Sequence, residues 1–76
     1  MKANELDELG FDMVDENEYS NGDFTIFILS EDKISIIGEN VDDFLSIPEM
    51  ICKKKIDLIR FFKLIGYDIQ GKNKVL

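Results

Sequence analysis

Carboxylates are the most numerous side chains of this sequence that could do chemistry. Sixteen Asp and Glu residues stand against nine Lys and Arg residues, for a net charge of −7. Two carboxylates in a pocket can act as acid and base in glycoside hydrolysis, provided that their surroundings move their pKa values apart. A chain of 76 residues leaves little volume for such a pocket. We therefore expect solvated surface acids and no catalytic residue among them.

The other groups on which enzymes commonly rely are absent or isolated. The sequence contains no His, which excludes a His general base, a Ser–His or Cys–His nucleophile pair and a His metal site. Its one Cys, Cys52, cannot build a zinc finger and has no His to activate it, so we expect a small buried hydrophobic residue. The five glycines are scattered and form no phosphate-binding loop. We expect no enzyme and no cofactor.

The acidic stretch from Asp15 to Asp23 has some features of a calcium-binding loop. With Gly22 at the sixth position of an EF-hand loop, Tyr19 falls at the third position and Ile28 at the twelfth, where oxygen ligands are required. Two required ligands are therefore missing, and a hairpin turn explains Asn21-Gly22 without a metal. We expect no metal site.

The charges are unevenly distributed along the chain. Residues 1–49 contain fourteen acids and two lysines, whereas residues 50–76 contain seven bases and two acids. The second part cannot neutralise the first, so an acidic face must remain exposed. We predict that this face binds a basic surface on a larger protein. Its candidate residues are Asp15, Glu16, Glu18, Tyr19, Asp23, Glu31, Asp32, Asp42 and Asp43.

The nature of the partner follows from the sign of the charge. Proteins that handle nucleic acids carry basic grooves for phosphates, and a compact acidic domain can compete for such a groove. DNA-mimic inhibitors, among them phage anti-defence proteins, work on this physical basis. We predict an inhibitor or modulator of this type.

A secondary basic face is the opposite hypothesis. Its residues are Lys53, Lys54, Arg60 and Lys63, on a segment with helical spacing. Such a stripe can bind phosphates or an acidic partner, including a second copy of the chain. Because the net charge of −7 repels nucleic acid at long range, we expect no direct nucleic-acid binding.

Local patterns predict the elements of the first half of the chain. Residues 4–9 fit a short helix, and residues 11–19 read as a first strand. Asn21-Gly22 favours a type I′ turn, which tolerates the positive φ angles required there. Residues 24–29 and 34–37 are rich in β-branched and aromatic residues and predict two further strands. Short connections make these strands antiparallel neighbours.

The strand predicted over 24–29 is apolar on both of its faces. Phe24 and Ile26 share one face, and Phe27 and Leu29 lie on the other. Either the strand is covered on both sides, or one face meets a partner. The second case gives an alternative function, a small structural or assembly protein that forms a homo-oligomer through its apolar sheet face.

The second half of the chain is predicted to be mainly helical. Residues 39–46 fit either a fourth, edge strand or a helical turn. Pro48 suits the first turn of a helix that continues to Gly66, with a break near 53–55 as an alternative. Residues 70–76 are expected to form a flexible tail.

Together these elements predict a single α+β domain over residues 1–76. A three-stranded, or four-stranded, antiparallel meander packs against one long C-terminal helix, with a short N-terminal helix. No stretch reaches the roughly 20 apolar residues of a membrane span, and no signal peptide is recognisable. A lone Cys fits a reducing compartment. We expect a cytoplasmic protein with no membrane partner, in the host cytoplasm if a phage encodes it.

Overall fold

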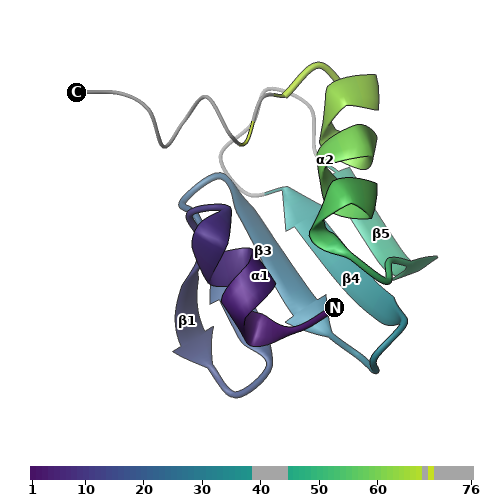
Figure 1. Cartoon of the computed structure of the whole chain (residues 1–76). Coiled ribbons are helices and arrows are strands. Elements are labelled where there is room, and N and C mark those ends of the chain that lie inside the picture. Colours follow the sequence, from purple (N-terminus) through teal and green to yellow (C-terminus); the bar gives the residue numbers. More distant parts are fainter. Residues whose placement is uncertain (39–44, 68, 70–76) are drawn as a thin grey trace.

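The computed structural model describes residues 1–38, 45–67 and 69. The elements follow in the order α1 (Ala3–Glu8), β1 (Asp12–Asp15), β2 (Glu18–Ser20), β3 (Phe24–Ile28), β4 (Lys33–Gly38), β5 (Leu45–Ile51) and α2 (Lys55–Leu64). The five strands form one antiparallel sheet in chain order (Figure 1). The predicted α+β class, the antiparallel meander and the short N-terminal helix are confirmed. The predicted tail over 70–76 and most of the ambiguous segment 39–46 lie outside the described residues.

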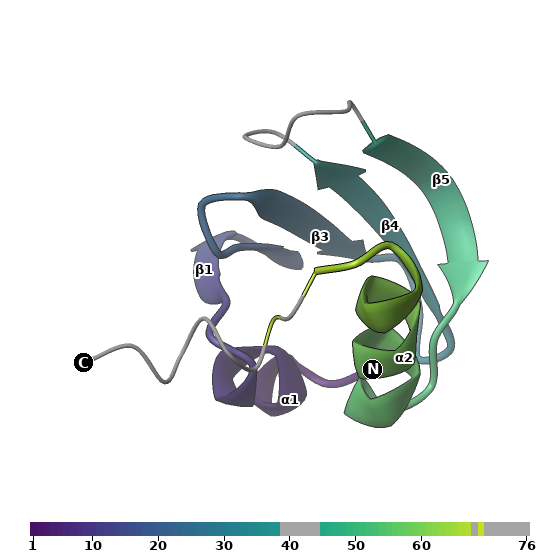
Figure 2. The ribbon, with the colours of Figure 1, turned by 90° about the horizontal axis from the view of Figure 1, so that it is seen from above.

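Both helices pack on the same face of the curved sheet (Figure 2). Alternate residues of β3 and β4 point to that face because side chains alternate along a strand. From α2, residues at helical spacings of three and four meet them. Phe24 and Phe62 form an edge-to-face contact with ring centroids 4.7 Å apart. The fully buried side chains of this core include Leu6, Phe11, Phe24, Ile26, Ile34, Ile36, Leu58 and Phe62.

The single strand predicted over 11–19 is wrong, because a turn divides it into β1 and β2. Asp15 pairs with Glu18 across this turn. Asn17 has φ of 59°, a left-handed conformation that Asn tolerates better than most residues. The alternation of apolar and acidic residues concealed this turn, whose only local signal is one Asn.

The turn between β2 and β3 lies where the sequence predicted it, but its geometry differs. Gly22 has the expected positive φ of 95°, whereas Asn21 does not have a positive φ. Asn21 instead uses its side chain, since Oδ1 accepts hydrogen bonds from the backbone N–H groups of Asp23 (3.0 Å) and Phe24 (2.9 Å). This side-chain turn replaces the predicted type I′ turn.

The prediction of one long C-terminal helix is also wrong for the first part of that helix. Pro48 lies within β5, an edge strand paired with β4, and the helix begins only at Lys55. Pro48 and Glu49 together oppose Ser35, which makes a bulge where a residue without an N–H group is tolerated. Ile51, which would share a face with Leu58 and Phe62 in the predicted helix, is 67% exposed in β5. Lys53 and Lys54 therefore precede the helix, as the alternative of a break near 53–55 required.

Candidate protein-docking surface

A bulge in β1 brings three carboxylates to one face of the sheet. Asp12 pairs with Ser20 and Asp15 pairs with Glu18. Because Glu18 and Ser20 are two residues apart, they share a face, and so do their partners. In a regular strand Asp12 and Asp15 would point to opposite faces. The register shift between Met13 and Asp15 places one extra residue, Val14, between them and so aligns the two acids.

These acids lie on the side of the sheet that faces away from the helices. Glu18 lies opposite Phe27, and Phe27 lies opposite Ser35. We call this side the outer face, and neither helix packs on it (Figure 2). Phe27 and Ile37 are half-buried there, and Ile51 is exposed at the β5 edge. The register assigns to the outer face Asp12, Asp15, Glu18, Ser20, Thr25, Phe27, Lys33, Ser35, Ile37, Ser46 and Ile51.

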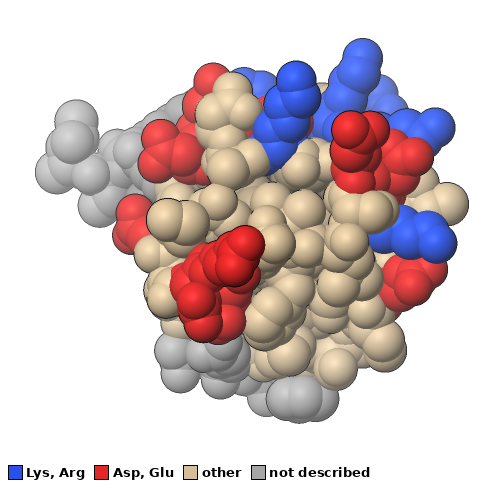
Figure 3. Space-filling view, turned by 90° about the horizontal axis from the view of Figure 1, so that it is seen from below, with Lys and Arg blue, Asp and Glu red and all other residues tan. Residues whose placement is uncertain are grey.

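No cation compensates the acids of the outer face within the described part of the chain. Residues 3–32 contain ten acids and no Lys or Arg. The two ion pairs of the described residues join Lys33 to Glu49 (3.2 Å) and Lys55 to Glu8 (2.6 Å). Figure 3 shows acidic side chains at its left and lower left, basic side chains along its upper part, and further acidic side chains beside the basic ones at its right. The β1–β2 side of the outer face is therefore negatively charged.

The predicted acidic residues do not form one continuous face. Asp15, Glu16 and Glu18 lie together on the β1–β2 hairpin, and Asp15 also accepts a bond from the Glu16 N–H group (2.7 Å). Tyr19 points to the helix side, is only 7% exposed and donates to Met13 Sδ (3.7 Å). Its ring is therefore part of the core and is not an exposed anchor. Asp42 and Asp43 lie outside the described residues.

Glu31 and Asp32 belong to a different surface, on the turn between β3 and β4. They line an open pocket of about 720 Å³. Lysines line the same pocket, so its charge is mixed rather than acidic. Its lining residues are Met1, Lys2, Asn4, Glu5, Glu31, Asp32, Lys53 and Lys54.

Asp23 lies at the other end of the sheet, because successive turns of a meander alternate between ends. The Tyr67 hydroxyl donates to Asp23 Oδ2 (2.8 Å) and accepts a bond from Asn21 Nδ2 (3.2 Å). The Tyr67 ring also contacts Phe24, with centroids 4.7 Å apart. Asp23 thus helps to hold the segment after α2 against the β2–β3 turn, which is a structural role.

In the secondary basic face, the backbone N–H groups that could bind a phosphate already donate to a carboxylate of the protein. Lys53, Lys54, Arg60 and Lys63 are all exposed. Lys53 and Lys54 precede α2, whereas Arg60 and Lys63 lie within it. The N–H groups of Lys53 and Lys54 both donate to Asp57 Oδ2, at 3.1 and 3.2 Å. These bonds hold the pKa of Asp57 below its ordinary value. A carboxylate of the protein thus already occupies the end of the helix that would otherwise bind an anion.

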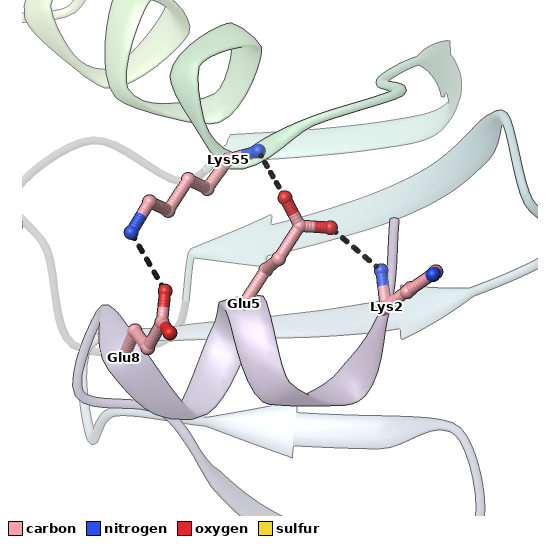
Figure 4. A network of polar contacts seen from close by, with 4 residues as sticks. All are labelled: Lys2, Glu5, Glu8 and Lys55. Carbon is pink, nitrogen blue, oxygen red and sulfur yellow. Dashed lines mark hydrogen bonds and ion pairs between the residues drawn. The ribbon is translucent and has the colours of Figure 1, made fainter.

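Glu5 has a similar role and joins the two helices (Figure 4). Its Oε1 accepts a bond from the Lys2 N–H group (3.1 Å), and its Oε2 accepts one from the Lys55 N–H group (3.0 Å). These two backbone bonds lower the pKa of Glu5. Beside them, Lys55 Nζ donates to Glu8. This function of Glu5 was not predicted from the sequence, although an acid three residues after a helix start is a capping signal.

Cys52 is confirmed as a buried hydrophobic residue. Its side chain is fully buried, and its Sγ lies 3.6 Å from the Lys54 carbonyl oxygen. Burial raises the pKa of its thiol to about 11, so the reactive thiolate is scarce at neutral pH. Over the ranges 1–38, 45–67 and 69, no cluster of three potential metal ligands occurs. Neither of the described helices is long and apolar enough to cross a membrane.

Comparisons with protein-family models, with curated proteins and with solved structures found no match. A docking role for the outer face therefore rests on the chemistry of its own residues. Asp12 and Phe27 both had a signal in the sequence, Asp12 as one of its acids and Phe27 as part of a strand that is apolar on both faces. The alignment of Asp12 with Asp15 depends on a bulge that has no sequence signature.

Proposed function

We propose that this protein is a non-catalytic docking module that binds a basic surface of a larger protein through its outer face. The observation that supports this function is the alignment of Asp12, Asp15 and Glu18 on one side of the sheet, with no base among residues 3–32. Uncompensated charge on a rigid sheet attracts and orients an oppositely charged surface. Half-buried Phe27 beside Glu18 adds apolar contact area.

The proposed partner is a protein that handles nucleic acid, which the docking module inhibits or modulates. Such proteins use Lys and Arg to neutralise a row of phosphates, and a row of carboxylates can occupy the same groove. Because both ligands bind through charge, the module and a nucleic acid compete. Binding should also weaken steeply with added salt.

Displacement of a labelled DNA duplex from purified nucleases, polymerases and repressors tests this function. We expect the wild-type protein to release the duplex from at least one of them at low salt. The test variant carries Asp12→Lys, Asp15→Lys and Glu18→Lys, and we expect it to lose this competition. No displacement by the wild-type protein across the panel would contradict the proposed nucleic-acid-handling partner.

A matched control distinguishes the effect of where the reversed acids lie from the effect of the change in net charge. Asp7, Glu31 and Asp32 are exposed acids outside the outer face. Reversing all three to Lys changes the charge as much as the test variant does, since either triple reversal adds six charges to −7 and gives −1. The control should still compete. Equal loss in both variants would show that net charge alone acts and that the outer face has no special role.

Self-association through the outer face is the second candidate function. Its supporting observation is the apolar side of that face, where Phe27 and Ile37 are half-buried and Ile51 is 67% exposed. Sedimentation or light scattering over a range of concentrations should then show a dimer, and Ile37→Thr with Ile51→Thr should shift it to monomer. A monomer at every concentration would contradict this candidate and leave the docking function unaffected.

A further inference from the structure

A continuous row of side chains crosses the outer face from its edge to its centre. The register places Asp15 opposite Glu18, Glu18 opposite Phe27 and Phe27 opposite Ser35. Directly opposed residues have Cβ atoms about 5 Å apart, so the Cβ atoms of Asp15, Glu18 and Phe27 lie within about 10 Å of one another. One long side chain of a partner can therefore touch all three groups.

The chemistry of this row favours one kind of side chain. A guanidinium group is planar, stacks on an aromatic face and donates bidentate hydrogen bonds to carboxylates. A lysine ammonium is more strongly hydrated and lacks this planar fork. A stacked nucleobase would bring its phosphate toward Asp15 and Glu18, which repel it. In the described part of the chain neither acid forms an ion pair with a cation of the protein. Asp15 is exposed and Glu18 is half-buried.

We infer that Asp15, Glu18 and Phe27 form a receptor for an arginine side chain on an exposed segment of the partner protein. This inference rests on the proposed docking function and specifies its partner chemistry. The carboxylates supply the attraction that any basic side chain experiences. Phe27 supplies the preference for arginine, because only the ring distinguishes a stacking cation from a compact one.

Titration with two short peptides, in which Gly alternates with Arg or with Lys, tests this assignment. Binding is followed from the backbone amide NMR signals of β2 and β3. We expect the wild-type protein to bind the Arg peptide about two- to fivefold more tightly than the Lys peptide, the range of an exposed cation–π contact. Phe27→Leu should still bind both peptides but with a ratio near one. Phe27→Trp should keep or increase the preference, since Trp is the best ring for such contacts.

The controls distinguish a failure of the arginine receptor from a failure of the docking function. Phe61→Leu removes a half-buried ring on α2, away from the outer face, and should leave the ratio unchanged. If wild type and Phe27→Leu prefer arginine equally, or if wild type has no preference, the receptor assignment is overturned while the docking function stands. If neither peptide binds the wild-type protein at low salt, both proposals fail. Thermal unfolding of each variant shows whether a lost preference reflects a lost fold.

Discussion

At the scale of single residues, the acids of this protein fall into two classes that the sequence alone does not separate. Glu5 and Asp57 accept backbone hydrogen bonds at the helix starts, and Asp23 accepts a hydrogen bond from the Tyr67 hydroxyl. Asp12 and Glu18 have no such partner in the described structure and face solvent from the sheet. The first class stabilises the fold, whereas the second belongs to the proposed docking surface. Asp15, which accepts a bond from the Glu16 N–H group, belongs to both classes.

Replacing Glu5 should destabilise the protein more than replacing a neighbouring acid. Glu5→Gln weakens two charge-assisted bonds, one at the start of each helix. We expect a loss of about 1 kcal/mol, typical of a lost helix cap, and a melting temperature lower by roughly 4–8 °C for a domain of this size. Asp7→Asn, an exposed acid of the same helix, is the control and should change little. Equal melting temperatures for both variants would contradict the bridging role.

The two lowered pKa values predict a loss of stability in acid. A carboxylate with a lower pKa in the folded state contributes stability above its unfolded pKa and loses it as pH falls through the folded value. The ordinary values are 4.5 for Glu5 and 3.8 for Asp57. Melting temperatures should therefore fall below about pH 4.5. In Glu5→Gln with Asp57→Asn this fall should be shallower, and an unchanged slope would rule out these two groups as its cause.

The buried thiol gives an independent test of the core. Because Cys52 is fully buried with a pKa raised to about 11, a thiol reagent should modify it only through opening of the fold. We expect the reaction at pH 8 to be at least about 100-fold slower than in denaturant, in line with the rarity of such openings in a stable domain. A native rate within a few-fold of the denatured rate would place the thiol at the surface.

At the scale of elements, the β1–β2 hairpin is the feature in which sequence and structure differ most sharply. In a continuous strand over 11–19, Asn17→Val would stabilise the protein and Asn17→Gly would destabilise it. In the hairpin the signs reverse, because φ of 59° at this position disfavours a β-branched residue and suits glycine.

We therefore expect Asn17→Val to lower the free energy of unfolding by roughly 1–2 kcal/mol, and Asn17→Gly to be neutral or stabilising. Urea unfolding measures both. Glu16, its neighbour in the same turn without a positive φ, is the control position and should tolerate Val better. A Val variant more stable than the Gly variant would favour the single strand.

The sequence predicted the elements whose signals are local. Dense β-branched and aromatic residues marked β3 and β4, and Gly66 marked the end of the last helix. The split of β1 from β2 depended on one Asn, and β5 depended on pairing with a distant strand that local spacing does not report. Ile51 matches the helical spacing of Leu58 and Phe62 by chance. For this reason the predicted helix began several residues too early in the chain. The acidity of the site was predictable, but its grouping was not, because it requires the bulge at Val14.

At the scale of the whole molecule, the order of the meander separates the acids and bases of the described residues in space. Residues 3–28 contain eight acids and no base and form α1 with the β1 side of the sheet. From Lys33 to Lys63, the described residues contain six bases and two acids, and they form the opposite side with α2 (Figure 1). Little neutralisation occurs between the two sides, apart from the contact of Lys55 with Glu8.

Among the described residues, this separation amounts to an electric dipole in addition to the net charge of −7. Net charge only draws the protein toward a basic surface, whereas a dipole also exerts a torque that turns it during the approach. The β1 side would thus reach the partner first, and the α2 side would trail. Fewer collisions would be wasted in wrong orientations, so the association rate should exceed that of an equally charged molecule with scattered charges.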